Sequence, residues 1–209
     1  MSIIDLTHPI EAEMSVYPGD EPPIITPTAT IARDGYRAQR LTITSHTGTH
    51  LDAPAHVLTG ARTLDQFPAS YFQGAARVVD CRQAQGEIDL RLLEPLARWQ
   101  GVDFILLMTG WDRHWGTEAY ASGFPVLSRQ AADWLAELPI KGIGLDTLSI
   151  DHPEAAGLPN HHAFLGQGKV IIENLAKLDA IPAQACQLYC LPLLLTAADG
   201  APARVIGVV

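Results

Sequence analysis

Residues 45–56 read Ser45-His-Thr-Gly-Thr-His-Leu-Asp-Ala-Pro-Ala-His56 and place three histidines and one aspartate within eleven positions. Imidazole and carboxylate groups together form a ligand set that zinc and manganese accept. In a straight strand, His46 and His50 would lie about 13 Å apart, which is too far for easy binding of one ion. A helix is disfavoured by Gly48 and by the neighbouring threonines and proline. We therefore expect a bent loop that leaves a strand over residues 41–45.

Gly48 permits this bend, and we expect that a side chain at this position would point into the ligand cluster. Pro54 stiffens the exit from the loop. The alternative interpretation treats the histidines as unrelated surface or capping groups, which is the usual role of a single histidine.

The second half of the chain offers further ligands. Residues 160–174 contain the pair His161-His162, a glycine-punctuated turn, and the apolar run 170–172 that ends at Glu173. A carboxylate in that position is costly to bury unless a metal or another cation neutralises it. Glu173 is therefore either a metal ligand or an exposed strand end. Three ligands would leave one position of a single ion open for water, whereas a bridging carboxylate and further ligands would build a two-metal site.

Hydrophobic periodicity predicts an α/β fold with a mixed sheet, and no linker or repeat divides residues 1–209 into more than one domain. Pro-Gly and flanking prolines predict an ordered loop over residues 14–23. We expect a helix over residues 89–99 that is kinked at Pro95, and a second helix over residues 128–138 with Ser128 as its N-cap. The expected strands cover residues 2–6, 24–31, 41–44, 77–80, 104–108, 140–145, 170–172 and 187–195.

Composition limits the partners. Hydrophobic residues make up 47% of the 209 residues and charged residues 18%, which excludes a disordered or coiled-coil chain. The net charge of −9 excludes general nucleic-acid binding, so a small molecule is the expected ligand. The apolar run 186–195 is too short to cross a membrane, and the N-terminus lacks a secretory signal, so we expect a cytoplasmic protein. Cys81, Cys186 and Cys190 are expected to be buried free thiols.

The stretch from His46 to His56 resembles the signature of the cyclase family of metal-dependent hydrolases, which includes bacterial kynurenine formamidases. The resemblance covers nearly the whole chain. It extends to Val16-Tyr-Pro-Gly-Asp20, Thr109-Gly-Trp-Asp-Arg-His-Trp-Gly116, Gly144-Leu-Asp-Thr-Leu-Ser-Ile-Asp151, and the segment from His161 to Leu175.

This resemblance implies a compact fold of the swivelling β/β/α kind, a homodimer or larger assembly, and two divalent metal ions per subunit, with zinc before manganese. By position in the family pattern, the first ion would be held by His46, His50 and Asp52. Asp52 would bridge to a second ion, which His161 and Glu173 would complete. The choice of His161 over His162 follows its twelve-residue separation from Glu173.

His56 would then be the catalytic acid/base rather than a ligand. A metal lowers the pKa of bound water from 15.7 to about 7, and a histidine with an ordinary pKa near 6.5 can move the proton from water to a leaving nitrogen. The implied reaction is hydrolysis of a small aromatic N-formyl amide, with N-formyl-L-kynurenine of tryptophan catabolism as the leading candidate. The alternatives are hydrolysis of a cyclic amide or lactone, as in isatin hydrolase, and a non-catalytic binding module of the same fold.

Tyr17 stands where the similar formamidases carry tryptophan. It is either an aromatic platform for a planar substrate, projecting over the mouth of the site, or an anchor for its loop.

Residues 111–115 form either a rim of the pocket or an ion pair capped by aromatic rings. His8 and His152 are expected to be structural or exposed, and Asp146 and Asp151 are expected to cap backbone N–H groups at a turn.

Overall fold

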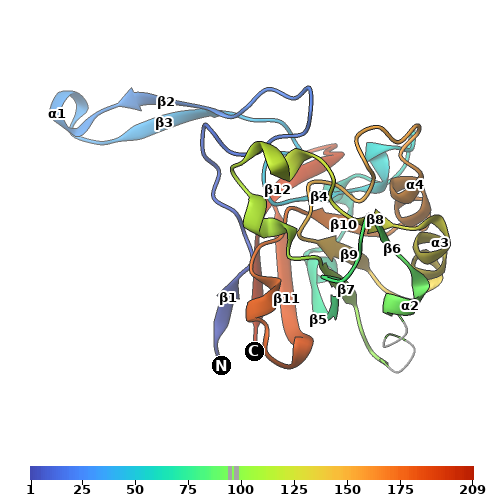
Figure 1. Ribbon diagram of the computed structural model, residues 1–209. Helices are drawn as coiled ribbons and strands as arrows, with labels where there is room; N and C mark the ends of the chain where they lie inside the picture. Colours follow the sequence, from blue (N-terminus) through green and yellow to red (C-terminus); the bar gives the residue numbers. More distant parts are fainter. Residues whose placement is uncertain (94–95, 97–98) are drawn as a thin grey trace.

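One mixed sheet forms the centre of the computed structural model, which describes residues 1–93, 96 and 99–209 (Figure 1). Its strand order is β1-β12-β11-β5-β7-β9-β10-β4. The bounds of these strands are β1 Ile3–Asp5, β4 His50–Asp52, β5 Gln73–Asp80, β7 Phe104–Met108, β9 Gly142–Leu145, β10 Val170–Glu173, β11 Ala185–Pro192 and β12 Gly200–Val208. The strands β5, β7, β9 and β10 run parallel to their neighbours in that series, and the remaining pairings are antiparallel.

The sheet closes on itself at β12. The first residues of this strand pair with β4, and the later ones pair with β11 on one edge and β1 on the other. Because β4 also pairs with β10, seven strands form a closed ring to which β1 is added. The predicted α/β class with a mixed central sheet is confirmed.

Successive side chains along each strand point to opposite faces of the sheet, and this alternation creates two apolar cores. Phe104, Leu106 and Met108 of β7 join a cluster contributed by strands all round the ring, so this cluster fills its interior. Ile105 and Leu107 face the other way and pack in a second cluster with the helices α3 (Arg129–Glu137) and α4 (Pro159–Leu165). The outer face of the sheet is therefore the face that α3 and α4 cover.

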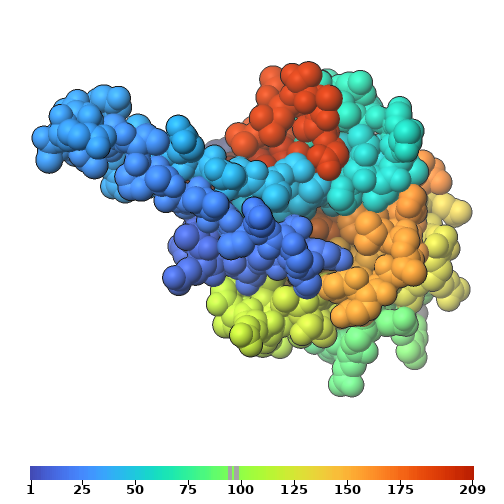
Figure 2. All heavy atoms as spheres, turned by 90° about the horizontal axis from the view of Figure 1, so that it is seen from above, coloured from blue at the N-terminus to red at the C-terminus, as the bar shows by residue number. Residues whose placement is uncertain are grey.

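A two-stranded arm leaves this body. The strands β2 (Ile24–Ala29) and β3 (Ala38–Thr42) pair only with each other among the described residues, and the short helix α1 (Ile31–Asp34) joins them at the tip. Figures 1 and 2 both show the arm projecting away from the rest of the molecule. The short strands β6 (Glu87–Ile88) and β8 (Val126–Leu127) form a second small sheet.

Most expected elements are present with shifted ends. The strand over residues 104–108 has the predicted bounds, and Ser128 caps α3 by accepting a hydrogen bond from the Ala131 amide (3.3 Å). Of the helix expected over residues 89–99, α2 covers Leu90–Leu93. Its expected kink at Pro95 lies outside the described residues. The loop over residues 14–23 is confirmed.

Three elements correct the sequence-based expectations. The bent loop ends earlier than expected because residues 50–52 form β4, a strand stabilised by pairing with β10 and β12. β12 was not predicted, since its glycines and proline resemble a turn. α4 was not predicted either, because its seven residues are too few to show a helical period. No helix within the described residues is long and apolar enough to span a membrane.

Candidate metal centre and catalytic site

The candidate site lies on the outer face of the sheet where β4 meets β10. The pairing places Glu173 opposite His50 and Ile171 opposite Asp52. Leu51, between the two polar residues of β4, points into the ring. His50 and Asp52 therefore face outward, toward the side on which α4 lies and to which it brings His161.

Four of the candidate residues are almost completely shielded from solvent, and we call them the buried group. Their side chains are between 0% and 6% exposed. The group consists of His50, Asp52, His161 and Glu173. Within it, Nε2 of His50 lies 3.2 Å from Asp52 Oδ1 and 3.6 Å from Glu173 Oε2. Nε2 of His161 lies 3.5 Å from Glu173 Oε1 and 3.7 Å from Asp52 Oδ2.

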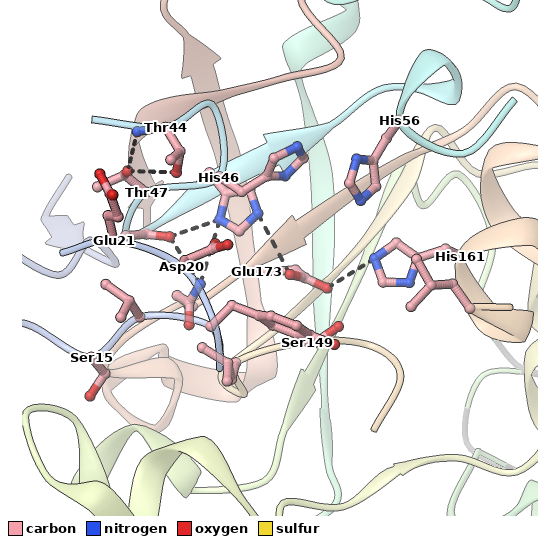
Figure 3. Close-up of a pocket in the computed structure, with 17 residues that line it drawn as sticks. Ser15, Asp20, Glu21, Thr44, His46, Thr47, His56, Ser149, His161 and Glu173 are labelled. Atoms are coloured by element: carbon pink, nitrogen blue, oxygen red, sulfur yellow. Dashed lines mark hydrogen bonds and ion pairs between the residues drawn. The ribbon is translucent and has the colours of Figure 1, made fainter. Parts of the chain in front are cut away.

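Three further residues form an open group at the solvent side of this cluster. They are His46, His56 and Asp199, with side chains 21%, 24% and 44% exposed. Asp199 Oδ2 lies 3.0 Å from His46 Nε2 and 3.5 Å from His56 Nδ1. Figure 3 shows the ring of His161 pointing toward the carboxylate of Glu173, with His56 on the same side of the pocket.

Each imidazole next to Asp52 is held from behind by an oxygen acceptor. His50 Nδ1 donates to the Gly48 carbonyl (2.8 Å), and His161 Nδ1 donates to Asp151 Oδ2 (2.8 Å). His46 uses Nε2 for Asp199 and presents Nδ1 to Asp52 Oδ1 at 2.8 Å. Such backing by an oxygen fixes the ring and leaves the opposite nitrogen free for a metal.

The buried group fits a cation. His50 Nε2 and Asp52 Oδ2 are buried and have no hydrogen-bond partner, which is costly for polar atoms of this kind. Two sets of ligand atoms lie within 4.8 Å of one another and share Asp52: one with His46 and His50, the other with His161 and Glu173. A divalent ion would bind the two unpaired atoms and balance the negative charge of the buried carboxylates.

The pKa shifts of the site residues also indicate that the cluster favours positive charge. Burial and the Asp52 carboxylate raise the pKa of Glu173. Burial disfavours a charged His46, but Asp52 and Asp199 outweigh it and raise the pKa of His46 to about 10. Burial lowers the pKa of His56, which keeps this imidazole neutral and able to accept a proton at neutral pH.

The sequence left a choice within the His161-His162 pair, and the structure separates the two. His161 is buried next to Asp52 and Glu173, whereas His162 is exposed on the other side of α4. Glu173 is itself buried and accepts a hydrogen bond from the Ile150 amide (2.8 Å). The alternative interpretation, in which Glu173 is an exposed strand end, is therefore wrong.

The expectation for Gly48 is wrong in one respect. It adopts the left-handed backbone predicted for the bend (φ +66°), but a Cβ there would contact Met14 and Ile10 rather than the ligands. Gly200 is the residue that leaves room, because a Cβ on it would lie 2.6 Å from Cε1 of His46.

A cavity of about 250 Å³ opens beside the cluster. Tyr17 lines it and also packs against an apolar cluster containing Tyr120 and Phe124, so it both borders the cavity and anchors its loop. Asp20 and Glu21 add carboxylates to the lining, and no described lysine or arginine contributes to it.

Residues 111–115 do not contribute to the cavity lining, so the interpretation that they form a rim of the pocket is wrong. The Asp112 carboxylate instead accepts a hydrogen bond from the Lys177 amide (2.8 Å). Trp115 stacks on His8, whose pKa burial lowers to about 4.

Sequence analysis missed three residues of the site. Asp199, which directly precedes β12, was not considered, and its carboxylate contacts the rings of His46 and His56. Asp151 caps the amides of Asn160 and His161 as expected, and also orients the His161 ring. Asn174 donates to the Gly48 carbonyl (2.9 Å) and so holds the bend.

The three cysteines are free, as expected; Cys81 and Cys190 are buried, and Cys186 is half-buried.

Comparison with known proteins points to one family. Residues 4–152 match the family model Cyclase, described as "Putative cyclase". The chain is 30% identical to a kynurenine formamidase of Bacillus cytotoxicus over 97% of its own length and 95% of the relative. It is 31% identical to a kynurenine formamidase of Bordetella pertussis with the same coverage of both chains.

Solved structures give the same result. Isatin hydrolase A from Labrenzia aggregata, bound to benzyl benzoate, superimposes with a TM-score of 0.88 at 25% identity, covering 98% of this chain and 92% of that one. A predicted metal-dependent hydrolase from Bacillus stearothermophilus superimposes with a TM-score of 0.83 at 29% identity, covering 99% and 97%.

Proposed function

The chain belongs to the cyclase family, and from this premise we propose that it is a metal-dependent hydrolase that cleaves a small aromatic N-formyl amide. N-formyl-L-kynurenine is the leading substrate, and its products would be kynurenine and formate. One observation carries the proposal: three imidazoles, each held from behind by an oxygen, face the buried Asp52 carboxylate at the edge of a cavity.

Two divalent ions would fit the donor set. His46, His50 and Asp52 would hold the first, and Asp52 with His161 and Glu173 would hold the second. Zinc is the first choice and manganese the second, because both accept mixed imidazole and carboxylate ligands. A bound ion supplies Lewis acidity and lowers the pKa of water at the site.

His56 is proposed to move the proton. It stands in the cavity wall, with its ring 4.1 Å from that of His46 and 5.5 Å from that of His161. In hydrolysis, the water oxygen bonds to the formyl carbon and the C–N bond breaks. His56 takes the proton from the attacking water and returns it to the leaving nitrogen, which leaves poorly without it.

The cavity supports a substrate with an aromatic face and without excess negative charge. The half-buried ring of Tyr17 offers a stacking surface. Asp20 and Glu21 favour a substrate that carries a cationic group, as the ammonium of N-formylkynurenine does, over an anion such as formylanthranilate.

Opening of a cyclic amide is the second candidate, favoured by the TM-score of 0.88 with an isatin hydrolase. The same proton transfer by His56 would serve it. The two candidates differ in the substrate alone, so only a direct comparison of substrates separates them.

The decisive experiment measures kcat/KM for N-formylkynurenine, formylanthranilate, isatin and a simple lactone at matched metal loading. We expect N-formylkynurenine to be the best substrate and formylanthranilate to be much poorer. A preference for isatin would contradict the proposed substrate but not the proposed hydrolase activity. If none of the four compounds is turned over, the formamidase proposal is wrong. The variant His56→Asn, loaded in the same way, serves as the catalytic blank.

Metal removal should cost stability as well as activity, because one centre joins β4, α4 and β10. A ligand at 1,000 times its Kd stabilises a protein by about 4 kcal/mol. For a domain of this size, this energy corresponds to a fall in Tm on the order of 10 °C. Thermal melts before and after treatment with EDTA measure it, with metal loss checked by elemental analysis. An unchanged Tm after confirmed loss would reject the ligand set.

A further inference from the structure

Tyr120 is a fully buried residue that is joined to the candidate metal centre although it does not line the cavity. Its phenol donates a hydrogen bond to Asn174 Oδ1 (2.9 Å). Burial raises the pKa of Tyr120 well above its ordinary value, so the phenol keeps the proton that it donates. Because solvent does not reach this hydrogen bond, removal of the phenol oxygen would leave the Asn174 acceptor unpaired.

Asn174 connects Tyr120 to a proposed metal ligand. Its Nδ2 donates to the Gly48 carbonyl (2.9 Å), which is the same oxygen that accepts a hydrogen bond from His50 Nδ1 (2.8 Å). A carbonyl oxygen has two acceptor positions, and both are used here. We call Tyr120, Asn174 and the Gly48 carbonyl the Tyr120 network. This network ends on the His50 ring, whose Nε2 has no hydrogen-bond partner.

The backbone of Asn174 is fixed as firmly as its side chain. Its φ of +57° lies in the left-handed region, which is unfavourable for most residues other than glycine but is tolerated by asparagine. Its N–H donates to the Thr147 carbonyl (3.1 Å), and its own carbonyl accepts from the Thr49 hydroxyl (2.6 Å). Every polar group of Asn174 therefore has a partner. The opposite orientation of the side-chain amide would place two acceptor oxygens, Oδ1 and the Gly48 carbonyl, against each other.

Two tryptophans of the segment 111–115 hold Tyr120. Trp111 Nε1 donates to the Tyr120 carbonyl (3.1 Å), and the ring of Trp115 meets the Tyr120 ring edge-on, with the centroids 5.0 Å apart. This segment does not line the cavity, but it is connected to the metal centre through Tyr120.

We propose that Tyr120 and Asn174 are positioning residues for the first metal ion, because they fix the Gly48 carbonyl that orients the His50 ring. The inference rests on the proposed metal centre and adds the residues that set the affinity of one of its ions. A ligand whose ring is held by an outer hydrogen bond binds its ion more tightly than one that must be ordered on binding. Weakening the Tyr120 network should therefore weaken the first ion.

The second ion has separate support. His161 is oriented by the Asp151 carboxylate (2.8 Å), which makes no hydrogen bond to Tyr120 or Asn174 among the described residues. Damage to the Tyr120 network should leave His161 oriented. Asp151→Asn should weaken the other ion, so combining it with Tyr120→Phe should weaken both.

Competition with a chelator, without substrate, measures metal affinity in the metal-loaded protein. Tyr120→Phe removes one hydroxyl and keeps the ring, and it should raise the Kd of the first ion roughly two- to tenfold. Asn174→Gly permits the left-handed backbone and should raise this Kd about 10–100-fold. Tyr71→Phe is the matched control and should not change it, because the Tyr71 hydroxyl donates to the Lys141 carbonyl (2.8 Å), which orients no proposed ligand.

Two further measurements separate positioning from a purely structural role. In the Asn174→Gly background, Tyr120→Phe should not weaken the first ion further, because the connection to Gly48 is already lost. With cobalt(II) as the probe ion, the visible absorption should change in each single variant and stay unaltered in Tyr71→Phe, since it reports the geometry of the ligands. A structural role alone would lower the Tm of the metal-free protein and leave metal affinity and absorption unchanged.

The outcomes distinguish this inference from the proposed function. If the wild type binds ions and both Tyr120→Phe and Asn174→Gly hold them as tightly as Tyr71→Phe does, the positioning role is wrong and the metal centre stands. A wild type that binds no divalent ion would overturn the metal centre and the positioning role together. Failure to hydrolyse the tested amides would contradict the proposed function alone, because metal affinity is measured without substrate.

Discussion

The buried group and the open group share one site but differ in what they lack. In the buried group, His50 Nε2 and Asp52 Oδ2 have no hydrogen-bond partner, and two carboxylates lie together out of contact with solvent. In the open group, His46 and His56 both reach the half-exposed Asp199 and the solvent. The first environment demands a cation that stays in place, whereas the second can exchange protons with water.

The largest effect should come from breaking the buried group at its centre. Asp52→Asn removes the carboxylate that three imidazoles face, so we expect loss of both ions and a fall in kcat/KM of about 10⁴-fold or more. Elemental analysis and kinetics measure the two together. Asp133→Asn, on the exposed face of α3, should change neither. Retention of two ions by Asp52→Asn would show that Asp52 is not the shared ligand.

Of the open group, His56 should respond in the opposite way, whereas His46 would be a ligand of the first ion. His56→Asn should keep both ions and lower kcat by about 10²–10⁴-fold, the usual range for a general acid or base. His162→Asn, a matched change at an exposed position on α4, should leave kcat unaltered. If His56→Asn loses an ion, His56 is a ligand and the division between the two groups fails.

Distance along the sequence, rather than this division, explains which residues of the site could be predicted. The motif from His46 to His56 is contiguous, so its chemistry is visible without a fold. Asp199 lies 153 residues from His46 and reaches it only because β12 pairs with β4, a pairing that leaves no local pattern. Glu173 was ambiguous for the same reason, since burial at a strand end depends on the neighbouring strand.

The fold shows the same limit. The strand over residues 104–108 is buried on both faces and reads as a continuous apolar run, so its bounds were predictable. β12 begins with Gly-Ala-Pro-Ala, which resembles a turn, and its role in closing the ring becomes visible only in three dimensions. Gly200, rather than Gly48, makes room for His46 because of that closure.

A smaller effect should follow when the support of a ligand is weakened. Asp151→Asn leaves every proposed ligand in place but removes the charge that orients His161, so metal affinity should fall about 10–100-fold. Competition with a chelator measures it. Asp146→Asn is the matched control, because Asp146 is equally buried and caps the Thr109 and Gly110 amides without contacting a histidine. Equal losses of affinity in both variants would indicate general destabilisation rather than orientation of His161.

The smallest effect concerns Tyr17, which borders the cavity from outside both groups. If its ring stacks on an aromatic substrate, the contact contributes about 0.5–1.5 kcal/mol, so Tyr17→Ala should raise KM roughly two- to tenfold. Tyr17→Trp should retain or improve binding. An aliphatic formamide has no ring to stack, and its kinetics should respond little to either change. Because Tyr17 also packs against Tyr120 and Phe124, equal losses for aromatic and aliphatic substrates would assign it to the loop alone. The aromatic preference would then rest on the relatives rather than on this cavity.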